Sequence, residues 1–296
     1  MALNLSGAFT ALVTPFRGDG SLDLDALARL VEWQIESGIS GLVPCGSTGE
    51  SATLTPEEHI RVVRHVVEVA SGRVPVVAGT GSNSTREAIE LTSAARSAGA
   101  DGALLISPYY NKPTQEGLFQ HFHAVARSTK LPIILYSIPG RCGIEIAVDT
   151  VNRLAHDSVN IVGIKEAGGN PDRVSQLRAT LGHKFSIFSG DDSLTLPFMA
   201  VGAHGVISVA TNVIPREVAH MVRAYSSGNH SLALKLHEKY YPIFKDLFIE
   251  TNPGPVKAAL AMMGIMEEEY RLPLVPISAA SREKLRKTLK ACGVLK

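Results

Sequence analysis

The chain has 296 residues, of which 45% are hydrophobic and 19% are charged, and its formal net charge is +1. This composition is typical of a soluble globular protein with enough apolar material for a sizeable core. A charge balance so near neutral provides no basic patch, so nucleic-acid binding is not expected.

The cysteine pattern and the first residues indicate a cytoplasmic protein. Cys45, Cys142 and Cys292 are odd in number and widely spaced, so they form neither a disulfide framework nor a CxxC zinc pair. Residues 1–16 lack the basic start of a secretory signal, and no apolar run is long enough to span a bilayer.

Eight short apolar runs, rich in β-branched residues, recur along the chain at intervals of roughly 20–35 residues. Each has the length of a buried strand, and segments with helical spacing lie between them. The predicted strands are residues 8–13, 41–44, 74–78, 103–106, 133–136, 161–164, 185–188 and 205–209.

Helix-start signals separate these runs. Thr55 precedes Pro56 and two acids, and Ser84 precedes Glu87 in a capping-box pattern. Further helices are expected at residues 23–37, from Thr114, Asn170 and Asp191, and at 215–225, 231–248, 255–263 and 278–291.

Strands that alternate with helices predict a closed (β/α)8 TIM barrel over residues 1–225. A C-terminal helical extension over residues 226–296 would pack on this barrel. A doubly wound open sheet is the competing fold. Its phosphate fingerprint is weak here, because the segment from Gly79 to Ser84 begins like GxGxxG but lacks the third glycine.

Lys165 follows the sixth predicted strand directly. Lysine is rarely fully buried, and burial would lower its pKa and make the amine a nucleophile that attacks carbonyl groups. The alternative is a strand-end lysine that reaches solvent or pairs with Glu166.

Polar residues follow other predicted strands at the carboxyl ends, where barrel enzymes place their catalytic groups. The segment 46–50 is either a simple turn or a small anion site. Tyr136 is either a core residue or a group that passes protons, and Arg141 is either a surface charge or a carboxylate clamp. The polar segments that follow the predicted strands are residues 44–51, 107–111, 136–141, 165–166 and 189–192.

Two other chemistries have weaker support. Asp191 and Asp192 suggest a metal pair, but at least one acid is expected to cap the next helix, and no further ligands accompany them. Cys45 and Cys142 adjoin the expected site without an evident base, which disfavours a cysteine nucleophile.

The chain resembles the dihydrodipicolinate synthase family, within the pyruvate-dependent class I aldolases that also include N-acetylneuraminate lyase. The resemblance covers nearly the whole chain. The motifs that carry it are GSTGES at 46–51, SPYYNKPTQEG at 107–117, YSIPGRCG at 136–143, GIKEA at 163–167, SGDD at 189–192 and GVISV at 205–209.

The resemblance implies a role for each matching residue. Lys165 would form the Schiff base with pyruvate, and Tyr136, Ser47 and Tyr110 would form a proton relay, with Tyr110 entering the neighbouring subunit's site. The implied substrate-binding residues are Thr48, Arg141, Ile207 and Gly190. Serine stands at 47 where the family commonly has threonine, so the relay hydroxyl is kept while its rotamer is less restricted.

The family pattern also implies a site for feedback inhibition by lysine, with Pro56 in place of a histidine found in some members. Helix capping and interface packing would account for the same residues. The residues that match the family's lysine site are Ser51, Ala52, His59, Asn83, Glu87 and Tyr109.

The activity implied is the condensation of pyruvate with L-aspartate 4-semialdehyde to 4-hydroxy-tetrahydrodipicolinate. This lyase reaction commits carbon to lysine and diaminopimelate biosynthesis and needs no metal, nicotinamide or pyridoxal cofactor. The family is usually a homotetramer made of two dimers. The alternatives are a pyruvate-dependent lyase of a sugar acid, a phosphate-binding barrel isomerase and a non-catalytic sensor.

Overall fold

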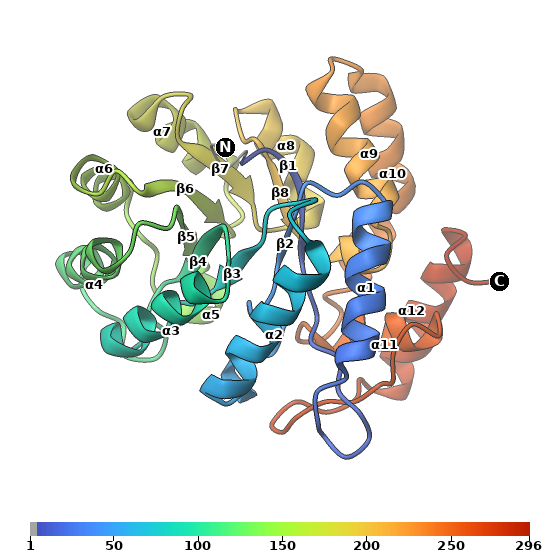
Figure 1. Ribbon diagram of the computed structural model, residues 1–296. Helices are drawn as coiled ribbons and strands as arrows, with labels where there is room; N and C mark the ends of the chain where they lie inside the picture. The colour runs from blue at the N-terminus through green and yellow to red at the C-terminus, as the bar shows by residue number, and fades with distance from the viewer. Residues whose placement is uncertain (1–4) are drawn as a thin grey trace.

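A barrel of eight parallel strands forms the centre of the computed structural model, which describes residues 5–296 (Figure 1). The strands pair in the order β2-β1-β8-β7-β6-β5-β4-β3, and a parallel bridge between Leu42 and Val76 joins the two ends. The predicted TIM barrel is confirmed. The strands are β1 (Gly7–Ala11), β2 (Gly41–Val43), β3 (Val77–Gly79), β4 (Gly102–Ile106), β5 (Ile133–Ser137), β6 (Ile161–Glu166), β7 (Ser186–Ser189) and β8 (Gly205–Ser208).

Helices surround the barrel on its outer side (Figure 1). Four begin at the predicted caps Thr55, Ser84, Thr114 and Asn170, and Thr55 completes a capping box with Glu58. The helix predicted from Asp191 starts later, after Leu194, because Asp191 caps a 3₁₀ turn instead. The helices are α1 (Leu24–Glu36), α2 (Pro56–Ala70), α3 (Thr85–Ser97), α4 (Gln115–Ser128), α5 (Pro139–Cys142), α6 (Val148–Asp157), α7 (Pro171–Leu181), α8 (Thr195–Ala200), α9 (Pro215–Ser226), α10 (His230–Asp246), α11 (Gly254–Met262) and α12 (Ala279–Ala291).

Several of these elements differ from the prediction; β1, for example, ends at Ala11 rather than at residue 13. β3 begins at Val77 rather than at residue 74, because Pro75 has no backbone N–H for a strand ladder. Helices α5 and α6 were not predicted at all. At the start of α3, Ser84 caps the backbone of Glu87, but the Glu87 carboxylate accepts from the Ser82 hydroxyl instead of completing the capping box.

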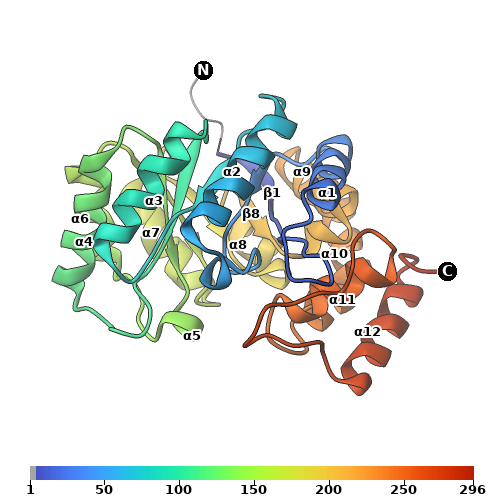
Figure 2. The same ribbon diagram turned by 60° about the horizontal axis from the view of Figure 1, so that its bottom comes forward.

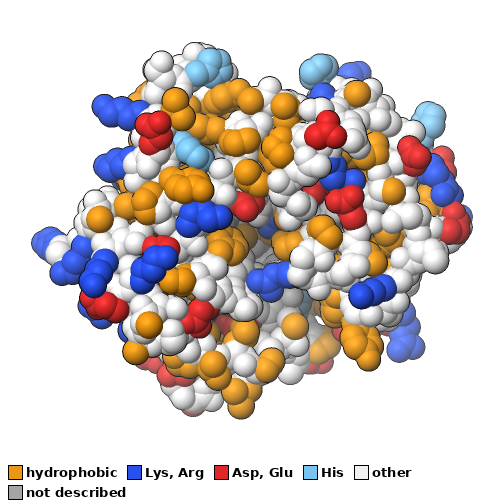
Figure 3. All heavy atoms as spheres, turned by 180° about the vertical axis from the view of Figure 1, so that it is seen from behind, with side chains coloured by type: hydrophobic (Ala, Val, Ile, Leu, Met, Phe, Trp, Pro, Cys, Tyr) orange, Lys and Arg blue, Asp and Glu red, His pale blue; other side chains and the backbone are white. Residues whose placement is uncertain are grey.

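The apolar core has an inner and an outer layer. Inside the barrel, side chains from seven strands and from Leu5 pack together, and the rings of Phe9 and Phe188 meet edge to face at 5.3 Å. Outside it, strand and helix side chains form two further clusters. On the face seen in Figure 3, Lys and Arg are interspersed with Asp and Glu, as the near-neutral net charge suggests.

The C-terminal helices α10, α11 and α12 lie together beside α1 and α9 (Figure 2). Their apolar side chains, such as Ile243 and Leu285, belong to the same cluster as Leu12 and Leu42 of the barrel region. The apolar core is therefore continuous across residues 225 and 226, and the predicted division into a barrel and an extension at this point remains a prediction. None of the helices within residues 5–296 has the length and apolar character needed to cross a membrane.

Candidate active site

Lys165 lies at the carboxyl end of β6 and is only 5% exposed. It pairs in register with Tyr136 of β5, and its Nζ lies 4.3 Å from the centroid of the Tyr136 ring. Neighbouring residues on a strand face opposite sides, so Glu166 faces the helices, where Arg173 of α7 binds it at 2.7 Å. Lys165 is therefore neither exposed nor paired with Glu166.

Burial lowers the pKa of Lys165 to about 8. Two neighbouring charges have smaller effects on this pKa: Asp192 raises it, and Arg141 lowers it. An ordinary lysine titrates near pH 10.4, so Lys165 has a much larger neutral fraction at mild pH. The neutral amine is the form that attacks a carbonyl group.

Asp191 and Asp192 have different partners. As predicted for a capping acid, Asp191 accepts the backbone N–H of Ser193 at 2.8 Å and starts a 3₁₀ turn. Asp192 is buried and accepts from the Ser208 hydroxyl and from two backbone N–H groups that follow β8. Burial raises the pKa of Asp192 to about 6. Across residues 5–296, no three His, Cys, Asp or Glu side chains gather so as to hold a metal ion.

Ser47 lies on a tight turn after β2. The backbone N–H of Gly49 donates to the carbonyl of Gly46 at 3.0 Å, and that of Glu50 donates to the carbonyl of Ser47 at 3.3 Å. Burial raises the pKa of Tyr136 to about 12, and a hydrogen bond with Ser47 acts in the opposite direction. The two hydroxyl groups are thus adjacent, as a proton relay requires.

Two adjoining cavities lie at this end of the barrel. A small cavity of about 40 Å³ is lined by Lys165 and Gly190, and a larger one of about 510 Å³ extends toward α2 and α3. Residues that line both cavities include Ser47, Tyr136 and Arg141. Lys165 therefore faces a space that adjoins the larger cavity at Ser47, Tyr136 and Arg141.

Arg141 and Thr48 meet at Asn252, a residue that the sequence did not single out. The Arg141 guanidinium donates to the Asn252 carbonyl at 2.8 Å, and the Asn252 amide donates to the Thr48 hydroxyl at 3.0 Å. Asn252 lines both cavities, and its buried Oδ1 has no hydrogen-bond partner within residues 5–296. An unpaired buried carbonyl oxygen can accept a hydrogen bond from a ligand.

Gly190 lines the small cavity, whereas Ile207 lines neither cavity. A Cβ atom at Gly190 would lie 3.1 Å from Cε of Lys165 and closer still to Cβ of Ala167, so a side chain would crowd the lysine. Ile207 lies in β8, and its side chain is buried in the barrel core.

The structure does not bring Tyr110 into the site of its own chain. Tyr110 is 92% exposed and lines neither cavity, while Tyr109 lines the larger one. Its φ of +72° lies in the left-handed region that non-glycine residues rarely adopt.

The candidate regulatory residues lie around the larger cavity. Asn83 stands beside it, and its amide donates to the Tyr109 carbonyl at 3.2 Å. His59 holds the carbonyl of Gly79 at 2.8 Å, and burial lowers the pKa of its imidazole. The residues that line the cavity directly are Ser51, Ala52, His59, Glu87 and Tyr109.

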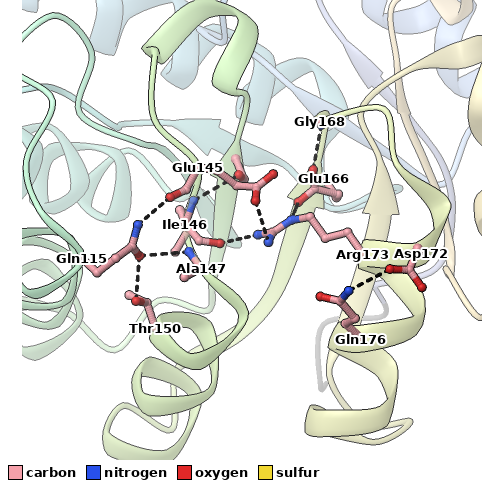
Figure 4. Close-up of polar contacts among 11 residues, drawn as sticks. Gln115, Glu145, Ile146, Ala147, Thr150, Glu166, Gly168, Asp172, Arg173 and Gln176 are labelled. Carbon is pink, nitrogen blue, oxygen red and sulfur yellow. Dashed lines mark hydrogen bonds and ion pairs between the residues drawn. The ribbon is translucent and has the colours of Figure 1, made fainter.

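Behind Lys165, Arg173 links β6 to the segment between α5 and α6 (Figure 4). Its guanidinium binds the carboxylates of Glu166 and Glu145, at 2.7 and 3.2 Å, and the carbonyl of Ile146. The backbone N–H of Gly168 donates to the second oxygen of Glu166 at 2.7 Å. This network ties the strand that carries Lys165 to α7.

Cys45 and Cys142 also line the larger cavity. Burial raises the pKa of both thiols. A thiol in that state is a poor nucleophile, so the low weight given to cysteine chemistry is supported.

A (β/α)8 barrel with a buried lysine at the end of β6, a tyrosine against it and an arginine on the same cavity indicates an aldolase-type enzyme. The chain belongs to the dihydrodipicolinate synthetase family, whose model matches residues 4–292.

Known relatives match the chain over almost its full length. A protein of Nitratidesulfovibrio vulgaris named 4-hydroxy-tetrahydrodipicolinate synthase is 52% identical over 99% of this chain and 100% of its own. The structure of the synthase of that name from Methylacidiphilum fumariolicum SolV is 57% identical, with a TM-score of 0.96 over 98% of this chain and 96% of that one.

Two similar structures contain ligands. The dihydrodipicolinate synthase of Acinetobacter baumannii, in complex with pyruvate, is 46% identical, with a TM-score of 0.96 over 99% of this chain and 100% of that one. The DHDPS of Cyanidioschyzon merolae, with lysine bound, is 41% identical, with a TM-score of 0.96 over 98% and 99% of the two chains.

Proposed function

We propose that this protein is a lyase that condenses pyruvate with L-aspartate 4-semialdehyde to give 4-hydroxy-tetrahydrodipicolinate. The observation that carries the proposal is the buried Lys165, with its lowered pKa, against Tyr136 at the carboxyl end of the barrel. The names of the relatives favour this activity over a sugar-acid lyase. The reaction would commit carbon to lysine and diaminopimelate biosynthesis.

The first stage is imine formation. The pyruvate carboxylate lies near the hydroxyls and backbone N–H groups of Ser47 and Thr48. The neutral Nζ of Lys165 bonds to the keto carbon, and the keto oxygen leaves as water after taking up two protons. The resulting iminium draws electrons from the methyl group, which loses a proton and becomes an enamine.

The second stage forms the carbon–carbon bond and the ring. The enamine carbon attacks the aldehyde of the second substrate, whose carboxylate Arg141 holds. Tyr136 gives a proton to the aldehyde oxygen through the relay with Ser47 and Tyr110. The substrate's amine then attacks the imine carbon, and Lys165 leaves as the free amine. The lysine imine supplies the activation, so no cofactor takes part in these steps.

The relay requires a second subunit. The exposed ring of Tyr110, held in a left-handed backbone conformation, favours insertion into a partner's site. A second apolar surface supports a dimer of dimers. Leu234, Tyr241 and Phe248 are partly exposed at seven-residue spacing, which places them on one face of α10 and the turn after it.

Feedback inhibition by lysine is the regulatory part of the proposal. Glu87 provides a carboxylate for an amino group, and Ser51, His59 and Tyr109 provide further polar atoms around the larger cavity. A bound lysine there would lie next to the Ser47 turn. The buried, unpaired cysteines support the cytoplasm as the site of action.

Borohydride trapping tests the central step. Pyruvate and borohydride should add a stable mass to the peptide that contains Lys165 and none to the Lys165→Met variant. Lys257 is an internal control, because burial lowers its pKa too while Glu50 occupies its amine. A wild-type protein with no adduct, or with one on another lysine, overturns the proposal. Product assays with aspartate semialdehyde and with sugar acids then identify the second substrate. Repeating them in the presence of lysine shows whether lysine inhibits the enzyme.

A further inference from the structure

A completely buried ion pair joins the C-terminal helices to the Ser47 turn. Nζ of Lys257, on α11, lies 2.5 Å from Oε1 of Glu50, and both side chains are 0% exposed. The rings of Phe16 and Tyr270 flank the ammonium at 4.3 and 5.2 Å. A buried pair of this kind adds little net stability compared with apolar side chains of the same volume. What it does fix is the relative position of the two segments that carry it.

Glu50 ends the turn that carries Ser47 and Thr48. Its φ of +55° is left-handed, and its backbone N–H closes the turn on the carbonyl of Ser47. Its second carboxylate oxygen accepts the backbone N–H of Arg271 at 3.4 Å. Ser47, Thr48 and Glu50 therefore belong to one short hydrogen-bonded turn, and a displacement of Glu50 would be passed to the residues that carry the two hydroxyls.

The same stretch of chain reaches the site a second time. Asn252, two residues before the start of α11, donates to the Thr48 hydroxyl and accepts from Arg141. Helix α11 and the segment before it therefore contact the turn at two points, Asn252 at Thr48 and Lys257 at Glu50. Lys257 lines neither of the two cavities of the site, so it acts through the turn and does not contact a ligand there.

We propose that the Lys257–Glu50 pair is a positioning device that holds the Ser47–Thr48 turn in the conformation that binds the keto-acid carboxylate. The C-terminal helices are by this inference part of the active site. The inference rests on the proposed pyruvate chemistry at Lys165.

Three variants test it by the pyruvate concentration that half-saturates borohydride trapping. Lys257→Met leaves the Glu50 carboxylate buried and unpaired, and Glu50→Gln removes the charge that draws the turn to α11. Each should raise the half-saturating concentration about tenfold, while the trapping rate at saturating pyruvate stays within about twofold of wild type. The double variant Glu50→Gln/Lys257→Met has no buried charge, so it should regain thermal stability but keep the weakened pyruvate binding.

The Lys284–Asp246 pair provides the matched control. It joins α12 to α10 within the same extension at 3.0 Å, and Lys284→Met should leave half-saturation unchanged. A double variant with both wild-type stability and wild-type half-saturation overturns the positioning role and leaves the proposed function intact. Absence of any trapping in the wild-type protein overturns both.

Discussion

The amine nitrogen of Lys165 lies 4.3 Å from the centre of the Tyr136 ring, its direct neighbour across the β5–β6 pair. Both residues are only 5% exposed. An amine and a phenol held side by side out of water have pKa values displaced in opposite senses. Burial lowers that of Lys165 to about 8 and raises that of Tyr136 to about 12. Near neutral pH the tyrosine therefore keeps its proton to donate, while the lysine can lose its own.

The rate of pyruvate trapping should rise with pH through a midpoint near 8. The neutral amine is the reactive form, and its fraction grows as the pH passes the lowered pKa of Lys165. Asp192→Asn should move the midpoint to lower pH, because the Asp192 charge raises this pKa. Asp172→Asn, on the surface of α7, is the control and should not move it. A midpoint near that of free lysine, or an upward shift in Asp192→Asn, contradicts the assignment.

Gly190→Ala should slow trapping strongly. The added Cβ would lie 3.1 Å from Cε of Lys165 and closer still to Ala167, so the lysine must move. A displacement of about 1 Å can cost about 10²-fold in rate. Gly140→Ala is the matched control, because its Cβ would have no neighbour within 4 Å. Equal trapping rates in the two variants would show that Gly190 does not set the lysine's position.

Arg173→Met should lower the free energy of unfolding by about 3–5 kcal/mol, because it leaves the fully buried carboxylate of Glu166 without its cation. The deficit should shrink at acid pH, where Glu166 is protonated and needs no cation. Arg178→Met, on the same helix, should cost less, since Arg178 binds carbonyl oxygens and no carboxylate within residues 5–296. Chemical unfolding at several pH values measures both. The double variant Glu166→Gln/Arg173→Met should be more stable than Arg173→Met, because it contains no unpaired buried carboxylate. If it is not, the buried charge of Glu166 is not the cause of the stability loss.

Local signals predicted most of the fold, and the exceptions have a physical reason. Thr55 and Glu58 complete a capping box within four residues, so the start of α2 is readable from the sequence. Helix α6 begins after Ala147, which offers no capping side chain. The backbone N–H of Ala147 donates instead to Oε1 of Gln115 at 2.9 Å, 32 residues earlier (Figure 4). A cap supplied by another helix leaves no mark near the helix that it starts.

The same contrast holds in the site. Lys165 was conspicuous because its apolar neighbours on one strand predict its burial. Asn252 and Lys257 meet Thr48 and Glu50 across 204 and 207 residues of sequence. An Asn-Pro pair and a lysine on a helix are ordinary in isolation. Only the packing of α11 and of the residues just before it brings them against the Ser47 turn.

The place of Tyr110 can be tested by mixing inactive subunits. Tyr110→Phe should lower turnover much more than it weakens pyruvate binding, because the proposed role of its hydroxyl is to move protons. If Tyr110 enters the partner's site, a dimer that combines one Lys165→Met subunit with one Tyr110→Phe subunit has one site with both residues intact. Random exchange of equal amounts should then restore about a quarter of wild-type activity.

Tyr136→Phe mixed with Lys165→Met is the matched control for this experiment. Tyr136 and Lys165 pair on adjacent strands of one chain, so no site in that hybrid has both residues, and activity should stay low. Recovery in the Tyr110 mixture alone requires that this exposed tyrosine works in the neighbouring subunit. Recovery in neither mixture, with subunit exchange verified by mass, means that Tyr110 does not complete a partner's site, and its exposed ring then needs another explanation.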